Sequence, residues 1–131
     1  MSPKRTNVET GSAEFVVGRD VNPVEYLLGS VVACVNSTGT MVARDMDLDI
    51  ESLDITVEGS VDYARYHGDV TDTRPGLQAL TITVDISADA AQETIEHWLE
   101  DVKRRCPITD TIANETPLDL SLADSTSAPH D

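Results

Sequence analysis

The sequence predicts an α+β fold in which a mostly antiparallel sheet packs on one long central helix. A long apolar stretch behind a strong helix-start signal predicts the helix, which runs from residue 23 to about residue 45. Two further helical patterns cover residues 90–105 and 106–113. Apolar residues that alternate with polar ones predict strands in three segments, residues 50–61, 80–86 and 118–122. With two short extended pieces before the long helix, the expected order is ββ-α-ββ-α-α-β.

The two ends of the chain are expected to contribute least to this fold. At 131 residues the chain is expected to form one domain. Residues 1–12 are expected to be mobile, although Gly11 and Ser12 can turn the chain between extended pieces at 6–10 and 13–17. The composition of the tail, residues 123–131, favours disorder. The predicted domain therefore spans residues 13–122.

The long helix is expected to begin at a capping box. Asn22 is a good N-cap, Pro23 suits the first helical position, and Glu25 follows the cap by three residues. The first half of the helix is apolar on nearly every face, which predicts burial all round. One small sheet cannot cover such a helix, so we expect a partner subunit in a two-fold homodimer.

The later elements follow from the spacing of their apolar residues, which is two in the strands and three or four in the helix. These residues are Leu80, Ile82, Val84 and Ile86 in the second strand, Ile95, Trp98, Leu99 and Val102 in the helix, and Leu118, Leu120 and Leu122 in the last strand. The sheet and the amphipathic helix are thus expected to share one apolar core.

The chain is strongly acidic. It carries 24 acidic residues against nine basic ones, for a formal net charge of −15. This charge argues against a basic patch that binds nucleic acid or an anionic membrane. The acidic excess is spread along the chain, which is typical of halophilic proteins from a salt-rich cytoplasm, although an ordinary acidic soluble protein is the alternative. Residues 1–10 lack the apolar core of a signal peptide, and Asn36, Ser37 and Thr38 interrupt the apolar run, so we expect a cytoplasmic protein without a membrane span.

Cys34 and Cys106 are the two cysteines of the chain, and they stand 72 residues apart. Cys34 lies inside the apolar helix. Cys106 precedes Pro107 and is expected at a helix N-cap, where amide groups and the helix dipole stabilise a thiolate. In a reducing compartment such a pair is more typical of catalysis, redox sensing or metal binding than of a structural disulfide. The pair predicts one site with an attacking and a resolving thiol, although a buried cysteine can also be inert.

Two charged residues precede Cys34 and are further site candidates. Arg19 lies just before the helix, where its cation would favour a thiolate and bind a polar substrate oxygen, unless it is an ordinary surface residue. Glu25 belongs to the capping box and can also hold Arg19 through a charge-assisted pair. A zinc site is a weaker alternative, because two cysteines without a CxxC or HxxxH spacing supply few ligands. His67 and His97 are expected to be exposed.

Four stretches together resemble the OsmC/Ohr family, which is named for osmotically inducible protein C and the organic hydroperoxide resistance proteins. They are Asn22-Pro-Val-Glu-Tyr-Leu-Leu-Gly-Ser-Val-Val-Ala-Cys34, Val57-Glu-Gly59, Arg74-Pro-Gly-Leu77 and Cys106-Pro-Ile-Thr-Asp-Thr-Ile. Their order and spacing cover about residues 13–122. The chain is most similar to the OsmC-like subgroup, because the peroxidase branch has a glutamate directly after the helix-opening proline, where this chain has Val24.

The resemblance implies an intertwined homodimer of α+β fold with two sites at the subunit interface. It implies that Cys34 reduces organic hydroperoxides and becomes a sulfenic acid, which Cys106 resolves as a disulfide. A small dithiol or lipoyl-type reductant would restore the thiols, and no bound cofactor is required. Arg19 is the residue that matches the family arginine, and Glu25 is the nearest glutamate. The alternative is a non-enzymatic OsmC-like stress protein that binds a hydrophobic ligand or senses redox state at its dimer cleft.

Overall fold

The computed structural model describes residues 5–9, 14–18 and 22–123, and its elements follow one another in the order ββαββαα. They are β1 (Arg5–Glu9), β2 (Glu14–Gly18), α1 (Pro23–Asp45), β3 (Ile50–Val61), β4 (Leu77–Ala88), α2 (Gln92–Arg105) and α3 (Pro107–Ala113). The strands β1 and β2 pair as an antiparallel hairpin, which the two extended pieces near the N-terminus predicted. The turn expected at Gly11 and Ser12 lies outside the described residues.

Helix α1 begins at the capping box that the sequence predicted. The side-chain oxygen of Asn22 accepts the Val24 N–H at 2.8 Å, and the carboxylate of Glu25 accepts the Asn22 N–H at 3.0 Å. These bonds satisfy backbone donors that a helix N-terminus leaves without partners. After the helix, Asp47 turns the chain toward β3 with a φ of 56°, a left-handed conformation that aspartate adopts more readily than most residues.

The strands β3 and β4 form a long antiparallel hairpin. Its register places Ile55 opposite Val84 and Val57 opposite Ile82, so the apolar side chains of both strands lie on the same face. The register shifts near both ends of the pairing, where bulges increase the local twist. One face of the hairpin is therefore apolar, and it is the face that packs on the helices.

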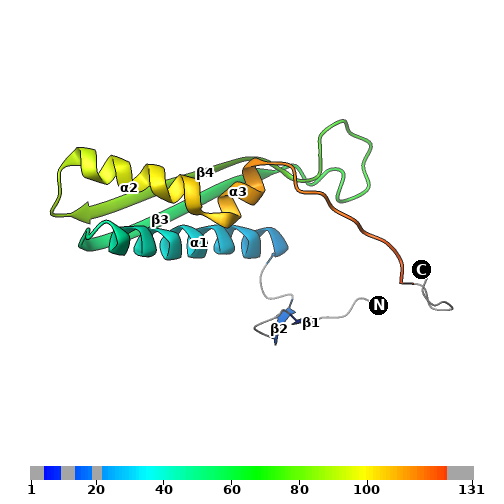
Figure 1. The fold of residues 1–131 in the computed structure, drawn as a ribbon. Coiled ribbons are helices and arrows are strands. Elements are labelled where there is room, and N and C mark those ends of the chain that lie inside the picture. The colour runs from blue at the N-terminus through cyan, green and yellow to red at the C-terminus, as the bar shows by residue number, and fades with distance from the viewer. Residues whose placement is uncertain (1–4, 10–13, 19–21, 124–131) are drawn as a thin grey trace.

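The core lies between the helices and this apolar face. In Figure 1, α1 and α2 run along the same side of the β3–β4 hairpin, and α3 follows α2 near the middle of α1. Trp98 of α2 is 1% exposed and is the largest fully buried side chain among the described residues. Its indole N–H donates to the carbonyl oxygen of Gly39 at 2.8 Å. A Cβ atom at position 39 would lie 2.8 Å from the Trp98 ring, so this close approach of α2 to α1 requires glycine.

The prediction of a last strand at residues 118–122 is wrong for the single chain. Residues 115–123 form neither helix nor strand, and Leu118, Leu120 and Leu122 are 85%, 89% and 97% exposed. The alternation of leucines is typical of a strand, but a strand forms only where a neighbouring strand supplies hydrogen-bond partners. Within the described part of the chain this segment has no such neighbour.

A single chain buries only part of α1, so the burial all round that the sequence predicts depends on the expected partner subunit. The buried residues of α1 face the hairpin and α2, and they are Val31, Val35, Thr38, Gly39, Val42 and Ala43. Tyr26, Leu27 and Met41 are exposed on the remaining surface of the helix. The reason is geometric, because one two-stranded hairpin and two shorter helices cover only part of a helix this long.

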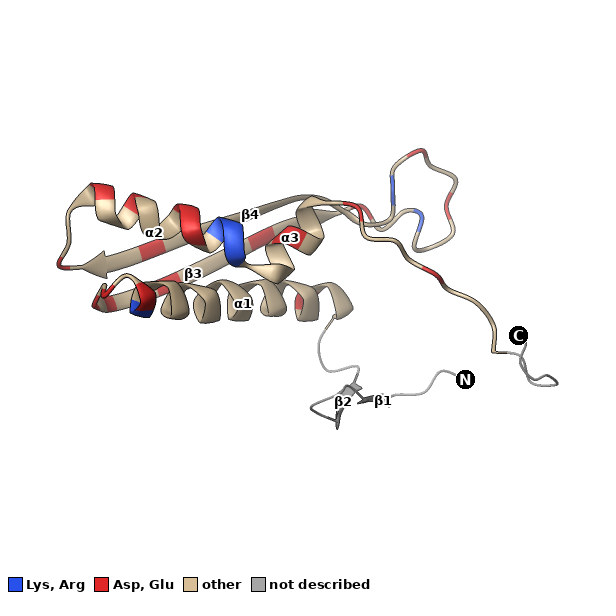
Figure 2. Ribbon diagram, in the orientation of Figure 1, with Lys and Arg blue, Asp and Glu red and all other residues tan. Residues whose placement is uncertain are grey.

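Acidic residues, red in Figure 2, are spread over the helices, the hairpin and its connection. Lys103, Arg104 and Arg105 form a basic stretch at the end of α2, and each pairs with a carboxylate. The pair of Arg105 with Asp45, at 3.1 Å, joins the C-terminal ends of α2 and α1. Helix α1 has the length and the mean hydropathy, 1.3, of a membrane-crossing helix, a composition that core helices of soluble proteins share.

Candidate functional site

The sulfur atoms of Cys34 and Cys106 lie 3.0 Å apart. Both residues are free thiols. Cys34 stands in the middle of α1 and is partly exposed, whereas Cys106 stands at the N-cap of α3 and is 1% exposed. The structure thus brings together the two residues that the sequence assigned to one site. Little movement separates this arrangement from the geometry of a disulfide.

The local structure around Cys106 explains how it reaches Cys34. Its backbone N–H donates to the carbonyl of Val102 at 3.0 Å, so Cys106 is held by the last turn of α2. Pro107 then starts α3 in a new direction, in the first helical position that proline favours. The contact of Trp98 with Gly39 fixes α2 against α1 two turns earlier. Cys106 therefore lies at the sharp turn between α2 and α3, with its sulfur next to Cys34 of α1.

Local interactions give the two thiols different acidities. Burial raises the pKa of Cys34, and the hydrogen bond with Cys106 raises it further. Burial also acts to raise the pKa of Cys106, but hydrogen bonds with Cys34, with Thr109 and with the Ile108 amide outweigh it. The pKa of Cys106 is therefore lowered, as expected for a thiol at a helix N-cap. Of the two thiols, Cys106 is therefore the one whose thiolate form the site favours.

Thr38 belongs to the same site, although it was not among the predicted site residues. It is buried, and its hydroxyl oxygen lies 3.9 Å from the sulfur of Cys34. This hydrogen bond acts to lower the pKa of Cys34, against the effect of burial. The signal in the sequence is the spacing: residues four apart on a helix are neighbours on its surface.

Glu25 and Arg19 are not brought to the thiols by the described part of the chain. Glu25 lies nine residues before Cys34, or about 13 Å along the helix axis, and its carboxylate accepts the amide of Asn22. Arg19 lies outside the described residues, so its place beside Cys34 stays a prediction. Within the described ranges, no group of three or more His, Cys, Asp and Glu side chains is placed to hold a metal ion.

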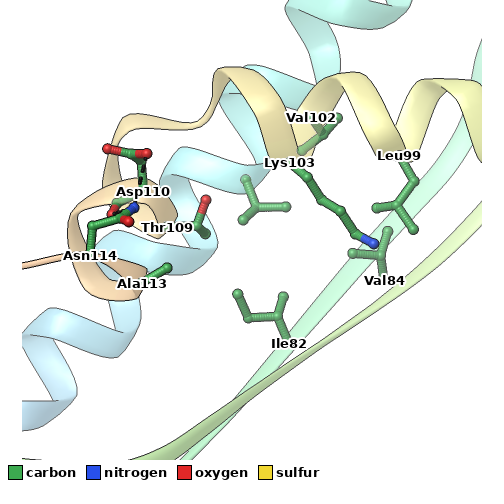
Figure 3. Close-up of a pocket in the computed structure, with 10 residues that line it drawn as sticks. Ile82, Val84, Leu99, Val102, Lys103, Thr109, Asp110, Ala113 and Asn114 are labelled. Carbon is green, nitrogen blue, oxygen red and sulfur yellow. Dashed lines mark hydrogen bonds between the residues drawn. The ribbon is translucent and has the colours of Figure 1, made fainter.

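A cavity of about 620 Å³ lies between β4, α2 and α3 (Figure 3). Most of its wall is apolar, and the apolar lining residues are Val35, Ile82, Val84, Leu99, Val102 and Ala113. The helices add the polar side chains of Lys103, Thr109, Asp110 and Asn114. Val35 follows Cys34 in the sequence, and the hydroxyl of Thr109 donates to the carbonyl of Cys106 at 3.3 Å. The cavity thus adjoins both thiol-bearing segments and suits an apolar small molecule.

The structure is similar to solved OsmC-like proteins. The OsmC-like protein from Mycoplasma pneumoniae gives a TM-score of 0.65 at 19% identity, over 88% of this chain and 89% of that chain. An OsmC-like hydroperoxide resistance protein from Jannaschia sp. CCS1 gives a TM-score of 0.64 at 14% identity, over 88% of this chain and 77% of that chain. At these identities the likeness is one of fold.

Comparison of the sequence with family models identifies the family, which the likeness of fold alone does not. No curated protein matches it significantly. The family model described as OsmC-like protein matches residues 17–121, which is most of the chain. This match covers the capping box, both cysteines and all elements from α1 to α3, and it confirms the resemblance seen in the sequence motifs. The chain therefore belongs to the OsmC-like protein family.

Proposed function

We propose that this protein is a thiol-dependent peroxidase that reduces organic hydroperoxides. The observation that carries the proposal is the distance of 3.0 Å between the sulfurs of Cys34 and Cys106, in a chain with no third cysteine. Membership of the OsmC-like family and the likeness of fold to an OsmC-like hydroperoxide resistance protein support the same chemistry. Such a pair can be oxidised by a peroxide and reduced again without any bound cofactor.

Accessibility favours Cys34 as the attacking thiol. A hydroperoxide has to reach the attacking sulfur, and Cys34 is partly exposed whereas Cys106 is buried. The lowered pKa of Cys106 complements this division of roles. Across their hydrogen bond, Cys106 takes the proton of the Cys34 thiol as the peroxide arrives, which leaves Cys34 as the nucleophilic thiolate. Arg19 would bind the peroxide oxygens, with Glu25 orienting its guanidinium group.

The reaction balances in three steps. The Cys34 thiolate attacks the terminal oxygen of the hydroperoxide, so that an S–O bond forms and the O–O bond breaks. The departing alkoxide takes the proton that Cys106 holds and leaves as an alcohol, which returns Cys106 to its thiolate form. The thiolate of Cys106 then attacks the sulfur of the Cys34 sulfenic acid, which forms the S–S bond and displaces hydroxide, and a proton from solvent converts this hydroxide to water. A dithiol or lipoyl-type reductant exchanges with this disulfide, restores both thiols and is itself oxidised.

The proposal is tested by the consumption of an alkyl hydroperoxide in the presence of dihydrolipoamide and molar salt. Cys34→Ser should consume none. With dihydrolipoamide left out, Cys106→Ser should consume about one equivalent per chain and keep Cys34 as a sulfenic acid, because no second protein thiol resolves it. Equal consumption by Cys34→Ser and the wild type would overturn the proposal.

A second candidate function is the binding of an apolar ligand without turnover, and the cavity of about 620 Å³ favours it. Apolar walls with a few polar groups are typical of ligand sites. The two candidates differ in their dependence on the thiols. An apolar fluorescent probe that binds wild type and Cys34→Ser equally, together with a wild type that consumes no peroxide, would favour binding over catalysis.

We also propose that the protein is a homodimer, because a single chain leaves too much apolar surface uncovered. Tyr26, Leu27 and Met41 are exposed on α1. The apolar face of the β3–β4 hairpin is only partly buried, and no strand among the described residues pairs with either outer edge of the hairpin. Open strand edges and exposed apolar faces are the features that a second copy covers in a two-fold assembly.

The exposed leucines suggest how the two copies join. Leu118, Leu120 and Leu122 alternate with Asp119 and Ser121 in an extended segment, which is the pattern of a strand with one apolar face. We propose that this segment pairs with an open edge of the partner's β3–β4 hairpin and adds its leucines to the partner's core. The strand that the sequence predicts would then form in the dimer and not in the single chain.

A further inference from the structure

Cys34 and Cys106 also suit a ligand that is not a peroxide. We propose that the reduced pair chelates the trivalent arsenic of organic arsenoxides, R–As=O, as a cyclic dithioarsonite. This inference does not rest on the peroxidase activity, because it requires two reduced thiols and no turnover. The sulfur atoms are 3.0 Å apart, so one atom can bridge them with little movement of either helix.

The distance between the sulfurs favours arsenic over other thiophilic ligands. Trivalent arsenic holds its ligands in a pyramid, with its lone pair on the open side, so two sulfur ligands come nearly into contact with each other. A soft cation with two ligands, such as Cu⁺, keeps its sulfurs on opposite sides and needs them much farther apart. Cys34 and Cys106 come from different helices and are already in contact, so chelation orders little additional structure.

Burial sets the order in which the two bonds form. Cys34 is partly exposed and makes the first bond to arsenic, after which the buried Cys106 closes the ring. The lowered pKa of Cys106 favours the thiolate that closes the ring. Val35 directly follows Cys34, the carbonyl of Val102 accepts the Cys106 N–H, and both valines line the apolar cavity. An apolar substituent on arsenic is therefore accommodated, and we expect aryl arsenoxides to bind better than inorganic arsenite.

The reaction conserves oxidation states. Two As–S bonds form, the bond between arsenic and its oxygen breaks, and the two thiol protons leave with that oxygen as water. Arsenic stays trivalent and neither sulfur is oxidised, so no electron donor or acceptor takes part.

The experiment uses phenylarsine oxide, added to the reduced full-length protein in oxygen-free buffer with excess 2-mercaptoethanol. The monothiol strips arsenic from single cysteines, whereas a chelate with two protein sulfurs survives. The expected result by intact mass spectrometry is one phenylarsenic group per chain, with loss of both titratable thiols and release by 2,3-dimercaptopropanol. Cys34→Ser and Cys106→Ser should each retain no phenylarsenic.

Two results would overturn chelation. One is a wild type whose two thiols titrate normally but which retains no phenylarsenic, a result that does not depend on the folding of any variant. The other is retention by either single variant equal to that of the wild type. Peroxide consumption measured on the same preparation keeps the two proposals apart, because a protein that consumes peroxide and binds no arsenic contradicts this inference alone.

Discussion

Trp98 donates its indole N–H to the carbonyl oxygen of Gly39 at 2.8 Å, across the contact between α1 and α2. Gly39 lies five residues after Cys34, and Trp98 lies eight residues before Cys106. The contact therefore sets how closely the two thiol-bearing segments approach. A side chain at position 39 would meet the Trp98 ring, so the geometry of the thiol pair depends on a residue that carries no chemistry itself.

Gly39→Ala is expected to lower stability and to separate the thiols. The added Cβ would lie 2.8 Å from the Trp98 ring, and overpacking of this kind costs about 1–3 kcal/mol. As α2 moves away, formation of the Cys34–Cys106 disulfide should slow. Chemical denaturation and the rate of thiol loss after a peroxide pulse measure the two effects.

The matched control is Gly29→Ala in the same helix. Nothing in the described part of the chain lies within 4 Å of a Cβ added there. Alanine has the higher helix propensity, so stability should rise by about 0.5–1 kcal/mol. If both variants were equally stable, the contact of Gly39 with Trp98 would not constrain the fold.

Thr38→Val is expected to shift the pH dependence of the reaction to higher pH. The Thr38 hydroxyl acts to lower the pKa of Cys34. Burial already raises this pKa in the wild type, and loss of the hydroxyl should raise it further. The rate rises with pH as the thiol pair ionises and Cys34 is more often the thiolate. At a fixed pH below that pKa the variant should thus react about two- to tenfold more slowly, for a hydrogen bond worth about 0.5–1.5 kcal/mol.

The pH profile of peroxide consumption distinguishes this effect from a general loss of structure. Thr40→Val is the control, because the Thr40 hydroxyl donates to the carbonyl of Asn36 and is not among the groups that shift the pKa of Cys34. Its profile should match that of the wild type. A Thr38→Val profile identical to the wild-type profile would show that the hydroxyl has no influence on Cys34.

Leu120→Asp is expected to weaken the proposed dimer. In the single chain Leu120 is 89% exposed, so a charge there should not harm the monomer. Burial of a leucine side chain contributes about 1.5–3 kcal/mol, and each dimer would lose two such contacts. Light scattering in molar salt should show dissociation at concentrations where the wild type stays dimeric. Ser121→Asp, on the opposite side of the same segment, should leave the mass unchanged; dissociation of both variants alike would contradict a strand with one buried face.

Salt is expected to stabilise the protein up to about 1 M. The formal net charge is −15, so the carboxylates within each chain repel one another. This repulsion is stronger where two chains meet. The Debye length falls from ~30 Å at 0.01 M to ~3 Å at 1 M, so the repulsion is nearly screened at the upper limit. The melting temperature should rise across this range and then level off. A melting temperature independent of salt would show that the acidic surface does not influence stability.

The sequence predicted the parts of the fold that depend on local patterns. Asn22 and Glu25 form their capping box because both partners lie within one helical turn. The hairpin of β3 and β4 follows from alternation in both strands. Cys106 takes its predicted N-cap position because Pro107 favours the start of a helix. Each of these features is decided by residues close together in the chain.

Features that depend on distant contacts were not predictable in the same way. Thr38 matters because its hydroxyl lies beside the Cys34 sulfur, and Gly39 matters because Trp98 packs on it. The approach of Trp98 to Gly39 depends on how α1 and α2 pack against each other. The strand at 118–122 shows the converse case. Its pattern is clear, but pairing depends on a partner that a single chain does not supply.

The central claim is that Cys34 and Cys106 form one redox pair, and a single peroxide pulse tests it most directly. Reduced protein receives one equivalent of an alkyl hydroperoxide in molar salt, is quenched with an alkylating agent, and is analysed by peptide mass spectrometry. We expect loss of both thiols and a peptide pair joined through Cys34 and Cys106. Two thiols that remain fully alkylated after the peroxide treatment would contradict the claim.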